Sequence, residues 1–93
     1  DRFSGIDYVI DARRPHGGRV TSILLDGREM TDTETVSVCI NSYRSSGAGG
    51  YEFLVGQKVL ADIQVDVADS MIEYIVQHPD IVVDTHKYCT VIE

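Results

Sequence analysis

Short runs of apolar residues, separated by polar or glycine-containing turns, make up the first third of the chain. Runs 6–10 and 19–25 are rich in β-branched and aromatic residues and predict two strands. Segment 13–18, with one proline and two glycines, predicts the turn between them. The dipeptide at 26–27, Asp-Gly, is a strong two-residue hairpin signal, so residues 28–30 should return beside the second strand.

Run 36–40, Val-Ser-Val-Cys-Ile, is apolar at nearly every position and predicts a third strand. A strand of this composition is expected at the centre of a sheet, covered on both faces. Cys39 lies within it and is expected to be a buried, unpaired thiol. A disulfide between Cys39 and Cys89 remains an alternative, because the sequence does not give the distance that such a bond requires.

A helix is predicted to begin at Asp66, which can cap it, and to end near His78, before Pro79. Its apolar residues recur at helical spacing and form one stripe: Ala68, Met71, Ile72, Ile75 and Val76. Segments 51–55 and 59–65 carry no clear pattern. The helix is therefore the one clear amphipathic element of the chain.

Two further short strands are predicted at 81–83 and 89–92. The predicted fold class is α+β, mostly β-sheet with one amphipathic helix. No internal repeat, low-complexity tract or linker divides residues 1–93, so we expect a single domain. The chain begins with Asp1 rather than Met, and we expect it to have been processed or cut from a longer protein.

The amino-acid composition indicates which classes of protein this chain can belong to. The chain has 93 residues, of which 43% are hydrophobic and 25% charged, values typical of a globular domain rather than a disordered one. No apolar run is long enough to cross a bilayer, and no signal peptide is recognisable. The net charge of −7 disfavours binding to duplex nucleic acid but permits a single nucleotide in a local positive pocket.

The most informative segment follows run 36–40 and combines an amide, a ring, a guanidinium and a glycine-rich loop. Asn41, Tyr43 and Arg44 precede loop 45–50, whose glycines can bring bare backbone close to a ligand. Tyr43 can stack on a nucleobase, and Arg44 can pair with phosphate or stack on a ring. The segment predicts a site for a flat, anionic ligand, with these candidate residues: Asn41, Tyr43, Arg44, Gly47, Gly49 and Gly50.

Structural explanations of the same residues remain open. Tyr43 can fill the edge of the core, Arg44 can be a surface charge that holds the loop, and the glycine loop can be a plain turn. We expect Asn41 to fix the loop through bonds to backbone rather than to touch a base. The aromatic residues Tyr51 and Phe53 are expected to anchor the loop in the core.

Other chemistry has weaker support in the sequence. A zinc site formed by Cys39, His86 and Cys89 is a third, less favoured hypothesis, because no paired CxxC or HxxxH motif accompanies these residues and an exposed His86 is the simpler expectation. No Walker-type lysine follows the glycine loop, and no nucleophile elbow is present. Asp11 and the arginines near it are expected to be surface residues.

The chain resembles the C-terminal domain of the 5′-nucleotidase family over nearly its whole length. The resemblance is carried by GIDYVID, by GGRVTSILLDGREMTDTETVSVCINSYRSSGAGGYEF and by VADSMIEYIVQH, in that order. Its most specific part is NSYRSSGAGGY, which is similar to the Asn, aromatic and Gly-Gly-x-Gly-aromatic signature of the family. The Tyr-Arg pair is most similar to the branch that hydrolyses 2′,3′-cyclic nucleotides and 3′-nucleotides.

The resemblance implies a division of labour between two domains. An N-terminal metallophosphoesterase domain, absent here, would hold a divalent metal pair and hydrolyse the ester, and the C-terminal domain would grip the base and ribose. Tyr43 would be one of two aromatic residues that sandwich the base. The family's ribose-binding aspartate falls at Gly49, so that contact would be missing. The second aromatic residue would belong to an upstream half of the domain that this chain lacks.

The resemblance thus predicts a nucleotide-binding fragment of a secreted, periplasmic or cell-wall-associated nucleotidase. The fragment would hold no catalytic residue, metal ligand or cofactor of its own, and would be inactive alone. Its partners would be a nucleoside or nucleotide and the catalytic domain, with self-association over surface that the missing half would cover. The alternative from a different class is a non-enzymatic α+β interaction module.

Overall fold

The computed structural model describes all 93 residues, and they fall into two compact units. The sheet unit comprises Asp1–Val36 and Val83–Glu93, and the loop-helix unit comprises Ser37–Val82. That the 93 residues form one domain stays a prediction.

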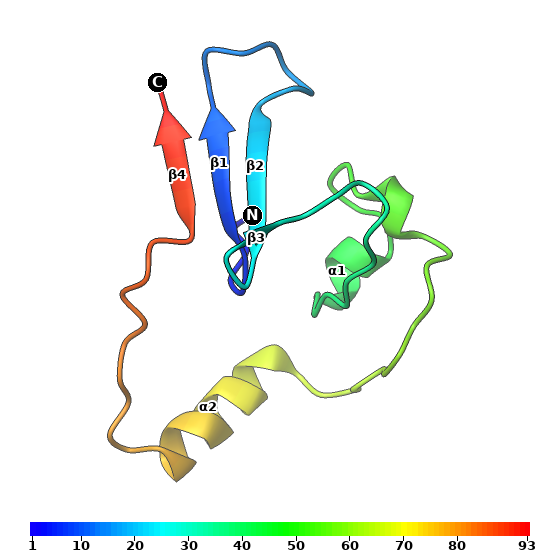
Figure 1. Ribbon diagram of the computed structural model, residues 1–93. Helices are drawn as coiled ribbons and strands as arrows, with labels where there is room; N and C mark the ends of the chain where they lie inside the picture. Colours follow the sequence, from blue (N-terminus) through cyan, green and yellow to red (C-terminus); the bar gives the residue numbers. More distant parts are fainter. The chain divides into compact units, whose positions relative to one another are not determined.

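The sheet unit contains four strands: β1 (Asp7–Asp11), β2 (Val20–Leu25), β3 (Arg28–Glu29) and β4 (Cys89–Ile92). They lie in the order β3-β2-β1-β4, with β4 beside β1 although the two come from opposite ends of the chain (Figure 1). The hairpin pairs are antiparallel and β1–β4 is parallel. Together with one main helix, this mixed sheet confirms the α+β fold class.

Tyr8 on β1 is the centre of the sheet unit. It is paired with Ile23 on one side and with Cys89 on the other, and it is only 8% exposed. The main-chain N–H of Phe3 donates to Tyr8 Oη at 3.2 Å, and the two rings meet edge to face. Tyr8 is the one large hydrophobic side chain that the chain buries, so this unit has a small core.

The hairpin between β2 and β3 forms as the sequence predicts. Asp26 and Gly27 both have positive φ, 52° and 75°, the backbone that a two-residue type I′ turn requires. The returning strand is shorter than expected and ends at Glu29. Beyond it, the guanidinium of Arg28 bonds both carboxylate oxygens of Glu34 at 2.5 and 2.9 Å, and holds the pKa of that carboxyl below its ordinary value.

The loop-helix unit contains α1 (Ser42–Ser45), the 3₁₀ turn η1 (Glu52–Leu54) and α2 (Val67–Gln77). The predicted helix is confirmed in type and extent: Asp66 caps α2 by accepting from the backbone N–H of Ala68 at 2.8 Å. Its apolar stripe is not covered, since Met71, Ile72 and Ile75 are each more than half exposed. None of the helices is long and apolar enough to cross a membrane.

The prediction of a central, buried strand at 36–40 is wrong. The segment forms no strand, and Val36, Val38 and Ile40 are between 41% and 55% exposed. A strand needs a neighbour to pair its backbone, and the segment pairs with none of the four strands. Cys39 is consequently exposed rather than buried.

The same reason accounts for the second wrong strand. Residues 81–83 are unpaired, and Val82 is 90% exposed. The strand predicted at 89–92 is confirmed as β4. Cys39 and Cys89 are both unbridged thiols, with Cys89 half-buried. Apolar composition therefore predicted a strand only where a partner was available.

Candidate functional site: the glycine loop

Asn41 organises the start of the candidate site. Its backbone is extended, and its Oδ1 accepts a hydrogen bond from the N–H of Arg44 at 2.9 Å, which caps α1. The expectation that Asn41 bonds to nearby backbone is therefore confirmed. The site differs from the prediction in one respect: Tyr43 lies in a one-turn helix and not at the end of a strand.

The loop that follows depends on glycine. Gly47, Gly49 and Gly50 have φ of +92°, +70° and +88°, which L side chains rarely adopt. A β-carbon at Gly47 would lie 2.8 Å from Cγ2 of Val55 and 3.3 Å from Cα of Glu52. The loop is therefore folded closely against η1, and position 47 has no room for a side chain.

Arg44 connects the rings to the loop. Its guanidinium carbon lies 4.6 Å from the Tyr51 ring centre and 5.3 Å from that of Tyr43, within cation–π range of both. Its Nη1 is 3.4 Å from the carbonyl oxygens of Ala48 and Gly49, the long end for a hydrogen bond. The reading of Arg44 as a charge that holds the loop thus has direct geometric support.

The aromatic residues differ in exposure. Tyr43 is 60% exposed, which leaves ring surface accessible for a planar ligand. Tyr51 is half-buried and packs against Phe53, with ring centres 5.6 Å apart. The prediction that Phe53 is a core anchor is wrong, because its side chain is 66% exposed.

Asp11 is also placed differently from the prediction of a surface residue. It is 9% exposed at the end of β1 and accepts two bonds from the Arg13 guanidinium, at 2.9 and 3.0 Å, and one from the Arg13 N–H at 3.1 Å. The bonds from Arg13 lower the pKa of Asp11, in spite of partial desolvation. Asp11 is therefore a structural carboxylate of the sheet unit.

Two of the three histidines contact other side chains. His86 is exposed, as expected, and its Nε2 lies 2.5 Å from Asp7 Oδ1, while His78 stacks on Tyr74 at 4.1 Å between ring centres. The structure does not gather three or more His, Cys, Asp or Glu side chains into a group that could hold a metal ion. The zinc hypothesis built on Cys39, His86 and Cys89 gains no support from it.

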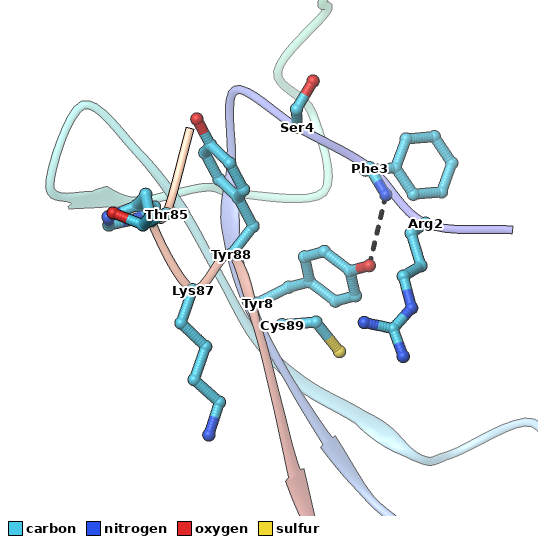
Figure 2. A pocket seen from close by; sticks show the side chains of 9 residues that line it. Arg2, Phe3, Ser4, Tyr8, Thr85, Lys87, Tyr88 and Cys89 are labelled. Carbon is cyan, nitrogen blue, oxygen red and sulfur yellow. Dashed lines mark hydrogen bonds between the residues drawn. The ribbon is translucent and has the colours of Figure 1, made fainter. Parts of the chain in front are cut away.

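A pocket of about 500 Å³ in the sheet unit was not predicted (Figure 2). Its lining includes Phe3, Tyr8, Tyr88, Arg2 and Lys87, and Figure 2 shows the Phe3–Tyr8 hydrogen bond across it while the Lys87 side chain extends away. Its walls come from the two ends of the chain, which the β1–β4 pairing brings together. A sequence motif of contiguous residues could not have revealed it.

Comparisons with known proteins agree with this architecture. Residues 2–56, which include β1, the hairpin and the glycine loop, match the family model described as "5′-nucleotidase, C-terminal domain". This chain belongs to the 5′-nucleotidase C-terminal domain family. The resemblance inferred from the sequence is thereby confirmed at the level of the family.

Two similar proteins are much longer than this chain. The trifunctional nucleotide phosphoesterase protein YfkN of Bacillus subtilis is 22% identical over 89 residues, which cover 83% of this chain and 6% of that protein. A Staphylococcus aureus protein described as a 5′-nucleotidase, solved in complex with alpha-ketoglutarate, matches with a TM-score of 0.88 and 28% identity. That match covers 96% of this chain and 18% of the Staphylococcus aureus chain.

Proposed function

We propose that this chain is a nucleotide-binding portion of a metal-dependent nucleotidase or cyclic-nucleotide phosphodiesterase. The observation that carries the proposal is the exposed Tyr43 ring beside Arg44 and a loop of positive-φ glycines, within a chain of the 5′-nucleotidase C-terminal family. In this role the base stacks on the Tyr43 ring, and Arg44, Asn41 and the loop glycines form the surface beneath the ring.

The chemistry of the role is orientation rather than bond cleavage. Base stacking on an aromatic ring contributes roughly 1–3 kcal/mol and tolerates any base. Holding the nucleotide at a fixed angle to a separate catalytic site lowers the entropic cost of hydrolysis. The divalent metal pair, with its ions roughly 3.5–4 Å apart, is assigned to a separate metallophosphoesterase domain.

Gly49 bears on the class of ester. The aspartate that binds ribose in the resembling family corresponds to this position, and glycine offers no side-chain acceptor for a 2′- or 3′-hydroxyl. We therefore propose a ligand whose ribose 2′- and 3′-oxygens are esterified or only weakly bound, as in a 2′,3′-cyclic nucleotide. A secreted, periplasmic or cell-wall-associated location belongs to the same proposal and follows from the resemblance.

Replacement of Tyr43 by Ala tests the role directly. Adenosine 5′-monophosphate and 2′,3′-cyclic AMP should perturb the NMR signals of residues 42–51 in the wild-type chain, with millimolar affinity because one ring alone supplies the stacking. Tyr43→Ala should abolish these shifts with little change in melting temperature, because Tyr43 is exposed. The purified chain should show no phosphatase activity.

Tyr74→Ala is the matched control, since Tyr74 is 56% exposed and lies on α2, away from the glycine loop in the sequence. It should leave the nucleotide-induced shifts unchanged. Equal shifts in wild type and Tyr43→Ala, or nucleotide turnover by the chain that survives metal chelation, would contradict the proposal.

A second role, a non-enzymatic interaction module, is favoured by the uncovered apolar stripe of α2, where Met71, Ile72 and Ile75 are exposed. Such a stripe buries readily against another protein or a second copy. Under this role the chain binds no nucleotide, and substitutions on α2 rather than at Tyr43 alter its association. Sedimentation of wild type and Ile72→Asp at several concentrations separates the two roles.

A further inference from the structure

Gly49 is the point at which the loop backbone comes closest to the Arg44 side chain. A β-carbon at Gly49 would lie 1.9 Å from Arg44 Nη1 and 3.2 Å from its Cζ, separations at which atoms overlap. The same β-carbon would be 3.7 Å from Cε1 of Tyr43, an ordinary contact distance. The missing side chain at position 49 therefore leaves the space that the guanidinium occupies.

The guanidinium in that space links three parts of the candidate site. It lies over the Tyr43 and Tyr51 rings, at 5.3 and 4.6 Å from their centres, and reaches the carbonyls of Ala48 and Gly49. A planar guanidinium suits this arrangement, because it can stack with its faces while donating from its edge. Tyr43 itself sits in a one-turn helix with no buried residue, so few other contacts hold its ring.

We propose that Arg44 is a positioning residue for nucleotide binding: its guanidinium, admitted by the missing side chain at Gly49, holds the Tyr43 ring so that a base can stack on it. The inference rests on the proposed function. An unheld ring samples several rotamers, and a ligand must then offset the entropy of fixing one of them. Arg44 supplies that restraint before the ligand arrives.

Gly49→Ala and Gly50→Ala form a matched pair. Both residues have positive φ, +70° and +88°, so alanine strains the backbone at each, but a β-carbon at Gly50 meets nothing within 4 Å. In the full 93-residue chain, titration with adenosine 5′-monophosphate should give a Kd about tenfold higher for Gly49→Ala than for Gly50→Ala, a loss within the range of one base–aromatic stack. Because alanine strains the backbone at both positions, the ratio of the two Kd values cancels that strain and leaves the effect of displacing the Arg44 guanidinium.

Two further measurements separate positioning from general stability. In an Arg44→Ala background, Gly49→Ala and Gly50→Ala should give the same Kd within about twofold, because the group that position 49 displaces is gone. The side-chain Nε–H signal of Arg44, shifted by the two rings, should move in Gly49→Ala and stay in place in Gly50→Ala. Arg44→Lys should not reach the wild-type Kd, since an ammonium lacks the planar fork.

Each outcome of these measurements either supports or overturns the positioning role of Arg44. Equal Kd values for Gly49→Ala and Gly50→Ala, with the wild type binding, would overturn the positioning role and leave the proposed function intact. Absence of binding by the wild type would overturn the proposed function, and the inference with it. If Gly49→Ala fails to fold by circular dichroism, Arg44→Ala carries the test: an unchanged Kd at an unchanged melting temperature overturns the role.

Discussion

The interactions that stabilise the sheet unit differ from those that stabilise the loop-helix unit. In the sheet unit, β1 is paired on one side by the next strand, β2, and on the other by β4 from the far end of the chain, and Tyr8 is buried between them. In the loop-helix unit, the interactions that define structure are local: caps, turn bonds and the contacts of Arg44 join residues within a few positions of each other. Most of its large apolar side chains remain exposed.

The two units therefore contribute to different properties: the sheet unit to stability, and the glycine loop to the proposed ligand binding. Burial of apolar surface is the main favourable term in folding, so the sheet unit carries most of what stabilises the chain. Local hydrogen bonds fix the shape of the glycine loop without burying the Tyr43 ring. A loop defined by local bonds can present a ring to a ligand, whereas a ring in the core, such as Tyr8, cannot.

The largest effect is expected from Tyr8→Ala. Removal of the one buried large side chain should lower the free energy of unfolding of the sheet unit by about 3 kcal/mol. Native-state hydrogen exchange should report faster exchange throughout β1, β2 and β4, while α1 and α2 keep their wild-type rates. Tyr8→Phe, which loses only the acceptor for the Phe3 N–H, should cost about 1 kcal/mol. Equal acceleration in both units would show that they unfold together.

An intermediate effect is expected from Asp66→Ala, the corresponding change in the loop-helix unit. Loss of the bond to the Ala68 N–H should destabilise α2 by about 1 kcal/mol. Far-ultraviolet circular dichroism should show a loss of helix signal. Asp66→Asn, which keeps an acceptor at the cap, should retain it, and an equal loss in both variants would contradict the capping role.

The smallest effect is expected from acid. The bonds from Arg13 hold the pKa of Asp11 below its ordinary value of 3.8, so their contribution to stability is complete above that pH and is lost as the pH falls through the lowered pKa. Denaturant titrations from pH 5 to pH 2 should therefore show part of the acid destabilisation of the sheet unit disappearing in Asp11→Asn. Parallel curves for wild type and variant would exclude Asp11 as a contributor.

The sequence predicted best those elements whose cause is local. The Asp26–Gly27 hairpin and the helix capped by Asp66 both depend on residues within a few positions, and both form where expected. Asn41 likewise makes the backbone bond that its position indicated. Backbone conformation and capping are short-range properties, so the sequence contains them directly.

Elements whose cause is distant were predicted less well. Segment 36–40 has the composition of a buried strand, but its backbone pairs with no strand of the sheet. The burial of Asp11 and the pocket near Tyr8 both depend on which segments meet in space. Within the candidate site, Tyr43 and Arg44 were found from residue type and order, but the contact that relates Arg44 to Gly49 required coordinates.

The parallel pairing of β4 with β1 has a consequence for how the chain assembles. β4 reaches β1 only after the chain has passed through the whole loop-helix unit, and because closing so long a loop costs entropy, we expect β4 to be the last strand to join. Until β4 joins, the backbone N–H and C=O groups on that side of β1 are unpaired. The late arrival of β4 thus leaves four residues of β1, from Tyr8 to Asp11, without a partner on that side while the rest of the sheet forms.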